Sequence, residues 1–240
     1  MAERRPAEPN VRDVLERWRD LVPRPRGNRA FTDHDAVADL IASHLDSYAY
    51  EHLSKTDRAW WEEAWNADEE AGAFSRLFGP EWILEMMDGF LGWFLIRKVA
   101  ASHEDLVAYP VLCRDLVEWL VTEELVAPEL AADARARADR AAEELPLTDE
   151  LADLLYRGSD ELELTEFTEI RDWVDQRAAI VRTEPGALWF RSDDGEEVGP
   201  VRVPEGAVEI ARIGWSLSAA SFGRSPEGWH ILEMGNVYPN

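Results

Sequence analysis

AIVRTEPGALWFRSDDGEEVGPVRV, residues 179–203, contains three short runs of branched and aromatic side chains. The triplets EPG (184–186) and DDG (193–195) separate these runs, and both are typical of turns between strands. Further stretches with strand character lie at 161–164, 215–222 and 229–237. Five or six short strands in about 80 residues predict a small antiparallel β-barrel, either SH3-like or OB-like. We expect a single helical turn within it, in residues 204–212.

The residues before Gly158 carry apolar side chains at the spacing of helices. Asn10, Ser102 and Thr148 each precede a predicted helix, and their side chains are of the kind that caps a helix N-terminus. We expect Pro110 to begin a further helix and Gly158 to end the last one. Predicted helices cover residues 11–22, 33–52, 57–65, 73–78, 81–99, 110–120, 129–145 and 149–156, and residues 102–105 predict one further helix start.

The change of pattern predicts an α+β protein, with an all-helical domain followed by the small barrel. We place a basic arm with a short helix at residues 1–30 and the helical domain at 31–158. The barrel domain then covers residues 159–240.

The chain has 240 residues, with 49 acidic and 25 basic side chains and a net charge of -24. Only Lys55 and Lys98 are lysines. We interpret this composition as halophilic, because in molar salt a Debye length of about 3 Å screens the self-repulsion of an acidic surface. GC-rich codon usage, which favours arginine, is the alternative. The charge excludes a uniformly basic nucleic-acid-binding protein, and the single cysteine, Cys113, excludes a disulfide scaffold.

Neither a secretory signal nor a membrane span is predicted. The first ten residues, MAERRPAEPN, lack the apolar core of a signal peptide. The most apolar stretch, residues 82–99, is interrupted by charged side chains, namely Glu85, Asp88, Arg97 and Lys98. Together with the lone thiol, this favours a cytoplasmic protein without a membrane partner.

Positive charge is concentrated at the N-terminus. Residues 1–30 carry a net charge of +3, whereas residues 31–160 carry -19 and residues 161–240 carry -8. Arginines in a proline-spaced segment can pair with phosphates through parallel hydrogen bonds and fold on binding. We therefore predict RNA or a ribonucleoprotein, such as the ribosome, as partner, contacted by Arg4, Arg5, Arg12, Arg19, Arg24, Arg26 and Arg29. The alternatives are an arm that docks on the protein's own acidic surface and a disordered tail.

The predicted barrel offers a second candidate surface for a nucleic acid. Trp215 and Trp229 begin two of its strands, where a pair of indoles could stack on a base. The alternative is that both side chains belong to the core of this small domain. The barrel has few arginines for a phosphate track, namely Arg191, Arg202, Arg212 and Arg224.

The sequence shows no constellation of residues typical of catalysis or metal binding. His34, His44 and His52 fall on one predicted helix, but even the shorter gap, of eight residues, separates two of them by about 12 Å along the axis, too far to share a metal. Cys113 lies in an apolar helical run, so we expect an inert, buried thiol. We predict no catalytic residue, metal or cofactor and favour a non-enzymatic binding protein.

Two other functions fit the sequence. Large apolar side chains crowd the predicted helix 81–99, so either the other helices cover it or the protein is an adaptor or homodimer that uses this helix as its seam. The other alternative is a hydrolase with an acidic cleft between the domains, in which His103 or His230 could take part.

Two segments are similar to archaeal proteins. Residues 82–102, WILEMMDGFLGWFLIRKVAAS, followed by a capped helix pair, resemble a helical module of uncharacterised archaeal proteins. Residues 229–239, WHILEMGNVYP, resemble the last strand of a small barrel in the same kind of protein. With the composition, the chain resembles a haloarchaeal protein that joins a helical domain to a C-terminal barrel. No functional residue carries over from this resemblance.

Overall fold

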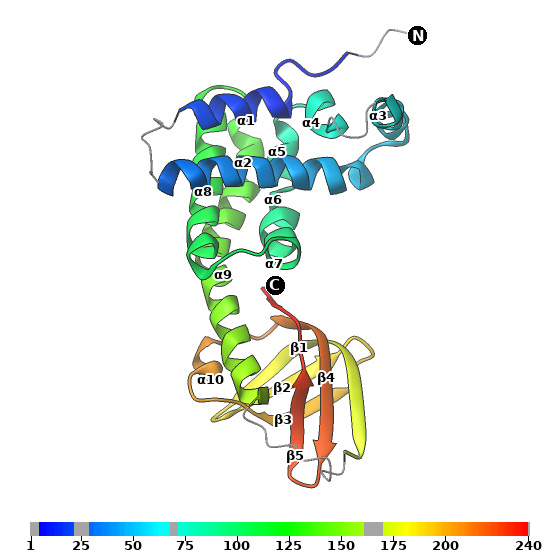
Figure 1. Ribbon diagram of the computed structural model, residues 1–240, viewed down its shortest axis with the longest axis vertical. Coiled ribbons are helices and arrows are strands. Elements are labelled where there is room, and N and C mark those ends of the chain that lie inside the picture. The colour runs from blue at the N-terminus through cyan, green and yellow to red at the C-terminus, as the bar shows by residue number, and fades with distance from the viewer. Residues whose placement is uncertain (1–4, 22–28, 68–71, 161–169, 240) are drawn as a thin grey trace. The chain divides into compact units, whose positions relative to one another are not determined.

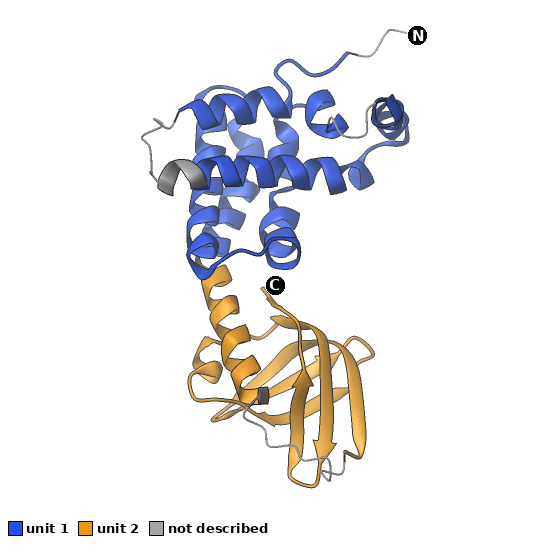
Figure 2. Ribbon diagram, viewed as in Figure 1, with its two compact units in different colours: residues 1–142 blue, residues 143–240 orange. Residues whose placement is uncertain are grey.

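The structure, a computed structural model, describes residues 5–21, 29–67, 72–160 and 170–239. Contacts within the chain divide it into two compact units, residues 1–142 and residues 143–240 (Figure 2). Helices form the first unit and a barrel of strands forms most of the second, so the protein has the predicted α+β fold. The alternating residues 161–164 lie outside the described residues.

Capping side chains begin two of the helices, as their sequences predict. Asn10 accepts a hydrogen bond from the backbone N–H of Asp13 at 3.0 Å, and Ser102 accepts one from that of Asp105 at 3.2 Å. In both cases the aspartate side chain accepts a hydrogen bond in return, which completes a capping box. The helical segments (Figure 1) are α1 (Val11–Asp20), α2 (Arg29–Tyr48), η1 (Ala49–His52), α3 (Lys55–Ala67), α4 (Ala73–Leu77), α5 (Glu81–Glu85), α6 (Met87–Gly89), η3 (Phe90–Phe94), α7 (Leu95–Lys98), α8 (His103–Thr122), η4 (Pro128–Leu130) and α9 (Ala131–Asp160).

Two prolines lie inside helices, where sequence rules predict a boundary. Pro110 is buried within α8 and does not begin a helix, and Pro146 lies within α9. Thr148 does not cap a new helix either, because its hydroxyl donates to the carbonyl of Leu145 at 2.9 Å. A proline inside a helix costs about 3 kcal/mol, so the burial of apolar side chains along these helices must outweigh that cost.

The apolar stretch 81–99 is not one helix. The backbone leaves the helical region at Met86, with φ -92° and ψ 2°, and residues Phe90–Phe94 then form a π-helical segment between α6 and α7. Most of the large apolar side chains are buried within the helical unit itself, including Ile83, Leu84, Met87, Phe90, Leu91, Phe94 and Leu95. Trp93 is the large side chain of this stretch that stays exposed, at 38%. The structure therefore favours intramolecular covering of this stretch over a homodimer seam.

The second unit is a five-stranded closed barrel with an extra strand. The strand order is β1-β2-β3-β5-β4, and a further pairing between β1 and β4 closes the barrel. A bulge near Ala178 and another near Ile180 allow β1 to pair with both neighbours. The strands are β1 (Asp172–Glu184), β2 (Ala187–Ser192), β3 (Glu197–Arg202), β4 (Ser216–Ser225), β5 (Gly228–Glu233) and the extra β6 (Val237–Tyr238), which pairs with β4.

Of the two predicted types of barrel, SH3-like and OB-like, the order of the strands corresponds to the OB-like type. The pairing of β3 with β5 is parallel, at Val201 and Trp229, and the other pairings are antiparallel. The prediction of an antiparallel barrel therefore does not hold at this one pairing, which is parallel. The short helix α10 (Ala207–Ile210) lies between β3 and β4, where a single helical turn is predicted.

The second half of α9 belongs to the barrel unit. Leu151 and Leu155 are buried in the barrel core together with Phe190, Trp215 and Phe222. The division between units consequently falls at residues 142 and 143, within α9, and not at the predicted boundary near Gly158. The helix continues through that glycine to Asp160.

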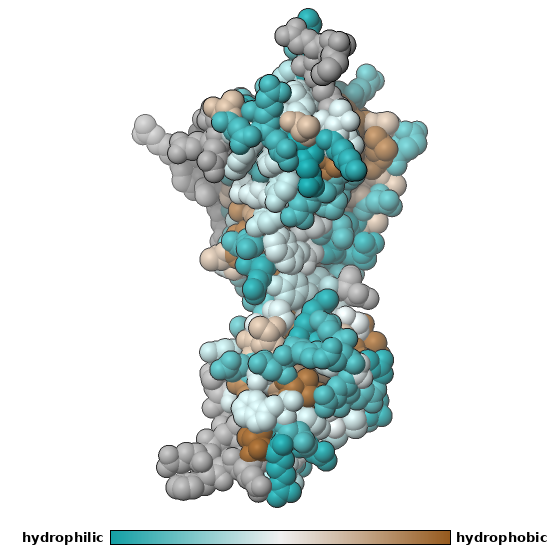
Figure 3. All heavy atoms as spheres, turned by 90° about the vertical axis from the view of Figure 1, so that its right-hand side faces the viewer, coloured by the Kyte–Doolittle hydropathy of each residue, from teal (hydrophilic) through white to brown (hydrophobic). Residues whose placement is uncertain are grey.

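Hydrophilic side chains cover much of one face of the molecule (Figure 3). Hydrophobic side chains form only small, scattered areas on this face. Among the described residues, no helix combines the length and the apolar character needed to cross a membrane.

Candidate functional site

The N-terminal segment is attached to the helical unit wherever the structure describes it. The backbone N–H of Ala7 donates to the carbonyl of Leu77 at 3.0 Å, and that of Val11 donates to Phe78 at 2.9 Å. Helix α1 packs against α2 and α4 and buries Val11, Val14, Leu15 and Trp18. Residues 5–20 are therefore part of the helical unit, although the sequence predicts a separate arm over 1–30.

Two arginines of α1 form ion pairs with carboxylates of the same unit. Arg19 pairs with Asp39 and also lies 3.8 Å from a carboxylate oxygen of Asp35, both on α2. The guanidinium of Arg17 lies 3.1 Å from the carboxylate of Glu123. These pairs correspond to the alternative in which the arginines dock on the protein's own acidic surface.

The other arginines predicted to bind RNA are either close to a carboxylate, exposed, or outside the described residues. A Cβ added at Gly72 would lie 2.9 Å from the guanidinium of Arg12 and 2.6 Å from the carboxylate of Asp46, so the two charged groups both lie against this glycine. Arg5 is exposed. Arg4, Arg24 and Arg26 lie outside the described residues, as does the side chain of Arg29.

The two predicted stacking tryptophans do not form an open platform. Trp215 is 2% exposed and packs in the barrel core, and Trp229 is 9% exposed. The prediction that both indoles stack on bases is therefore corrected for Trp215, whose ring has no open face. Trp229 also belongs to the barrel core, and it lines a pocket at the edge of that core.

That pocket has a volume of about 340 Å³ and lies beside the turn between β4 and β5. Arg202 from β3, Arg224 from β4, and Trp229 and His230 from β5 line it. We call these four residues the β4–β5 turn site. The sequence marks the site only weakly, by the turn residues 225–228 between an arginine and a Trp-His pair.

Arg224 presents a cation over an aromatic ring at this site. Its guanidinium carbon lies 5.8 Å from the ring centroid of Trp229, within the range of a cation–π interaction. Arg224 also forms an ion pair with Asp172 at 3.5 Å, and both side chains are about half exposed. Exposed pairs of this kind contribute about 0–1 kcal/mol, so Arg224 can exchange Asp172 for another anion at little cost.

His230 and Ser225 form a hydrogen-bonded pair that faces the same turn. The hydroxyl oxygen of Ser225 lies 2.8 Å from Nε2 of His230 and also accepts the backbone N–H of Glu227 at 3.1 Å. Burial lowers the pKa of His230; the charge of Glu227 opposes this shift and that of Arg202 adds to it. This arrangement fits a neutral imidazole whose Nε2 accepts a hydrogen bond from the hydroxyl of Ser225.

In the part of the chain that the structure describes, the remaining histidines and the cysteine do not assemble into a metal or catalytic site. Within the described residues, no group of three or more histidine, cysteine, aspartate or glutamate side chains could hold a metal ion. Cys113 is buried in α8, and burial raises the pKa of its thiol well above its ordinary value. The ring of His34 lies against that of Trp18 at a tilt of 35°, with centroids 4.7 Å apart, and His44 is buried among aromatic rings.

No protein-family model, curated protein or solved structure matches this chain. The similarity to haloarchaeal proteins therefore stays a prediction, and a functional proposal depends on the geometry alone.

Proposed function

We propose that the protein is a binding protein whose barrel contacts a phosphate-bearing strand, RNA or RNA within a ribonucleoprotein, through the β4–β5 turn site. One observation carries this proposal. Two exposed arginines, Arg202 and Arg224, flank a pocket with an aromatic edge in a unit that is otherwise strongly acidic.

The chemistry and the position of the site both support this ligand class. A guanidinium forms paired hydrogen bonds with phosphate oxygens, and it also stacks on flat rings. In OB-like barrels, the loop between the fourth and fifth strands is one of the places where oligonucleotides bind. Arg202 and Arg224 would contact phosphates, and the Arg224–Trp229 pair would contact a base.

The N-terminal arginines have a smaller part in this proposal than the sequence suggests. Arg17 and Arg19 are paired with carboxylates of the helical unit. Arg5 remains as an exposed cation that can add a phosphate contact. Deleting residues 1–30 is a poor test, because it would also remove the buried face of α1. Substituting Arg5→Ala tests the arm without removing core residues.

The test is retention of a single-stranded RNA of mixed sequence on a filter at graded KCl. The variant is Arg224→Ala, and the matched control is Arg191→Ala. Arg191 is also about half exposed and also pairs with a carboxylate across a strand pair, that of Glu197 at 2.7 Å. In the range where affinity falls with salt, losing one phosphate contact should reduce the slope of log affinity against log salt by about 0.7.

We expect Arg224→Ala to show this smaller slope and a weaker affinity, whereas Arg191→Ala should behave as the wild-type chain. Equal effects of the two substitutions would mean that Arg224 has no particular part in RNA binding, and the assignment to the β4–β5 turn site would be refuted. No retention of the wild-type chain at any KCl concentration would refute the proposal.

The Ser225–His230 pair favours a second candidate function, a hydrolase whose serine, only 7% exposed, lies beside the β4–β5 turn site. A serine hydroxyl within hydrogen-bond distance of a neutral histidine is the arrangement of an activated nucleophile. This function predicts that the protein cleaves a chromogenic carboxylic ester and that Ser225→Ala abolishes the cleavage. If Ser225→Ala leaves any measured rate unchanged, the pair serves only to hold the turn.

A further inference from the structure

The helical unit contains a larger pocket that plays no part in the proposed RNA contact. It has a volume of about 640 Å³ and lies between the segment α5–α6 and the first part of α9. Leu84, Met87 and Leu130 provide apolar surface in it. Leu130 is 58% exposed, so this apolar surface is open to a ligand.

One side of the pocket is formed by a buried guanidinium. The side chain of Arg137 is only 5% exposed, and its Nε atom lies 2.7 Å from a carboxylate oxygen of Asp88. A Cβ added at Gly92 would lie 2.7 Å from Nη2 of Arg137, so the absence of a side chain at residue 92 makes room for the guanidinium. The π-helical segment brings this glycine into position. Arg140, three residues further along α9 and exposed, adds a second cation.

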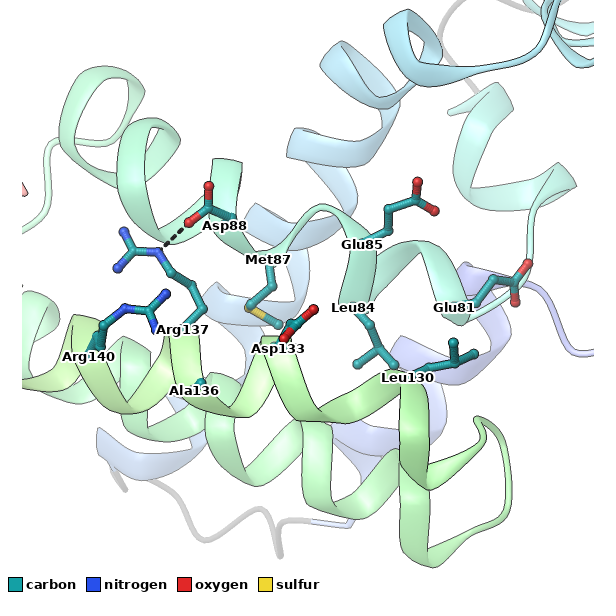
Figure 4. Close-up of a pocket in the computed structure, with 11 residues that line it drawn as sticks. Glu81, Leu84, Glu85, Met87, Asp88, Leu130, Asp133, Ala136, Arg137 and Arg140 are labelled. Carbon is teal, nitrogen blue, oxygen red and sulfur yellow. Dashed lines mark ion pairs between the residues drawn. The ribbon is translucent and has the colours of Figure 1, made fainter. Parts of the chain in front are cut away.

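Charge is distributed unevenly along the pocket. Figure 4 shows Arg137 and Arg140 at one end, Met87 and Leu84 in the middle, and Glu81 at the other end. Glu85 adds negative charge away from the arginine end, Asp133 lies in the middle beside Met87, and Asp88 lies at the arginine end, where it pairs with Arg137. A ligand that fits this distribution has an anionic group at one end, an apolar middle and a cationic group at the other.

The length of the pocket distinguishes between ligands with this pattern. Leu130 and Arg140, both of which line it, are ten residues apart, which is about 15 Å along a helix axis. A single amino acid is too short to reach from one end to the other. An extended peptide rises by about 3.3 Å per residue, so four residues cover about 13 Å, and the side chain of the first residue reaches the rest of the distance.

We propose that this pocket binds the C-terminal end of a peptide. The terminal carboxylate pairs with Arg137 and Arg140, one or two apolar side chains contact Leu84, Met87 and Leu130, and a basic group faces Glu81. Arg137 keeps its contact with Asp88 and is held in place before the ligand arrives, so little ordering of this side chain accompanies binding.

Calorimetric titration of the full chain with a synthetic tetrapeptide, Lys-Leu-Ala-Leu, tests the proposal. The comparison peptide is the same sequence with a C-terminal amide, which has lost the negative charge. We expect the amide to bind at least about tenfold more weakly, as expected when a charge pair in a partly buried site is lost. Equal affinity of the acid and the amide would overturn the proposal, as would a failure of the acid to bind.

Substitutions at the pocket provide an independent check. Arg140→Ala should weaken binding of the free acid about threefold or more, because Arg140 is exposed and its removal leaves the fold intact. The matched control is Arg97→Ala, an exposed arginine of the same unit that does not line the pocket. Equal affinities of the two variants would overturn the assignment of the carboxylate to the arginine end.

An N-acetylated form of the tetrapeptide distinguishes two sources of such a ligand. If acetylation leaves the affinity unchanged, the pocket recognises the C-terminal tail of a longer chain. If acetylation abolishes binding, it recognises a free oligopeptide. Both results support a carboxylate-dependent peptide site, and both are independent of the RNA retention measured for the barrel.

Discussion

Lowering the pH from 7 to 5 should destabilise the helical unit through one buried histidine. His44 on α2 is 2% exposed, and its ring lies among those of Tyr48, Phe90 and Phe94, with centroids 5.6, 5.7 and 4.9 Å away. Burial lowers the pKa of His44 from 6.5 to about 4. The backbone of Met86 opposes this shift, and the nearby charge of His52 adds to it. The imidazole is therefore neutral in the folded protein at neutral pH.

The sign of the pH effect follows from proton uptake on unfolding. Between pH 6.5 and pH 4, the unfolded chain binds a proton at His44 that the folded protein does not bind, so stability falls as the pH falls through this window. At 1.36 kcal/mol per pKa unit, the full window corresponds to about 3 kcal/mol, and the part between pH 7 and pH 5 to about 2 kcal/mol. Above pH 6.5 the contribution of His44 is constant.

Urea unfolding at pH 7 and pH 5, followed by helical circular dichroism, measures this loss. His44→Leu replaces the imidazole with an apolar side chain of similar volume and should lose about 2 kcal/mol less stability between the two pH values than the wild-type chain. The many carboxylates titrate in both proteins, so their contribution cancels in the comparison. His103→Gln, which removes an exposed imidazole, should match the wild-type chain. If His44→Leu loses as much stability as the wild-type chain, His44 is not the cause.

Three further substitutions and modifications test particular contacts. The thiol of Cys113, whose pKa burial raises, should react with an aromatic disulfide reagent only after unfolding in urea, and rapid reaction of the folded protein would contradict its burial. Asn10→Ala removes the cap of α1 and should lower the free energy of unfolding by about 1 kcal/mol in urea titrations, whereas no change would mean that α1 frays in solution. Gly199→Ala places a side chain at φ +150° and 2.8 Å from the ring of Trp189, so it should cost about 1–3 kcal/mol and lower the melting temperature of the barrel; an unchanged melting temperature would show that strand β3 adapts freely at this residue.

Local sequence signals predicted the elements whose ends depend on nearby residues. The caps at Asn10 and Ser102, the turn at 184–186 and the helical turn at 207–210 all depend on contacts within a few residues, and all are present. Pro110 and Thr148 misled the prediction, because local rules do not include the burial of the helices that contain them. The break at Met86 has no sequence signal either, since apolar content does not specify backbone dihedral angles.

The candidate sites were harder to predict because they depend on distant contacts. The sequence shows that arginines gather near the N-terminus, but Arg17 pairs with a carboxylate 106 residues away. Similarly, nothing local distinguishes the buried Arg137 from the other arginines of α9, because its environment is set by Asp88 and Gly92 on another segment. For Trp215 the core interpretation, which the sequence left open, is the one that the structure supports.

The net charge of -24 changes how salt should act on the RNA binding that we propose for the barrel. The acidic surface repels RNA over a distance of several ångströms. Salt screens this repulsion, because the Debye length falls from about 10 Å at 0.1 M salt to about 3 Å at 1 M. Contacts between Arg202 or Arg224 and a phosphate act at hydrogen-bond distance, so they weaken only through competition with counterions. Raising KCl from a low value should therefore first increase the affinity and then decrease it, whereas a basic protein shows only the decrease. A fall in affinity from the lowest KCl concentration onward would show that the acidic surface does not oppose RNA binding. The inference that the β4–β5 turn site binds RNA against the repulsion of the surrounding surface would then be wrong.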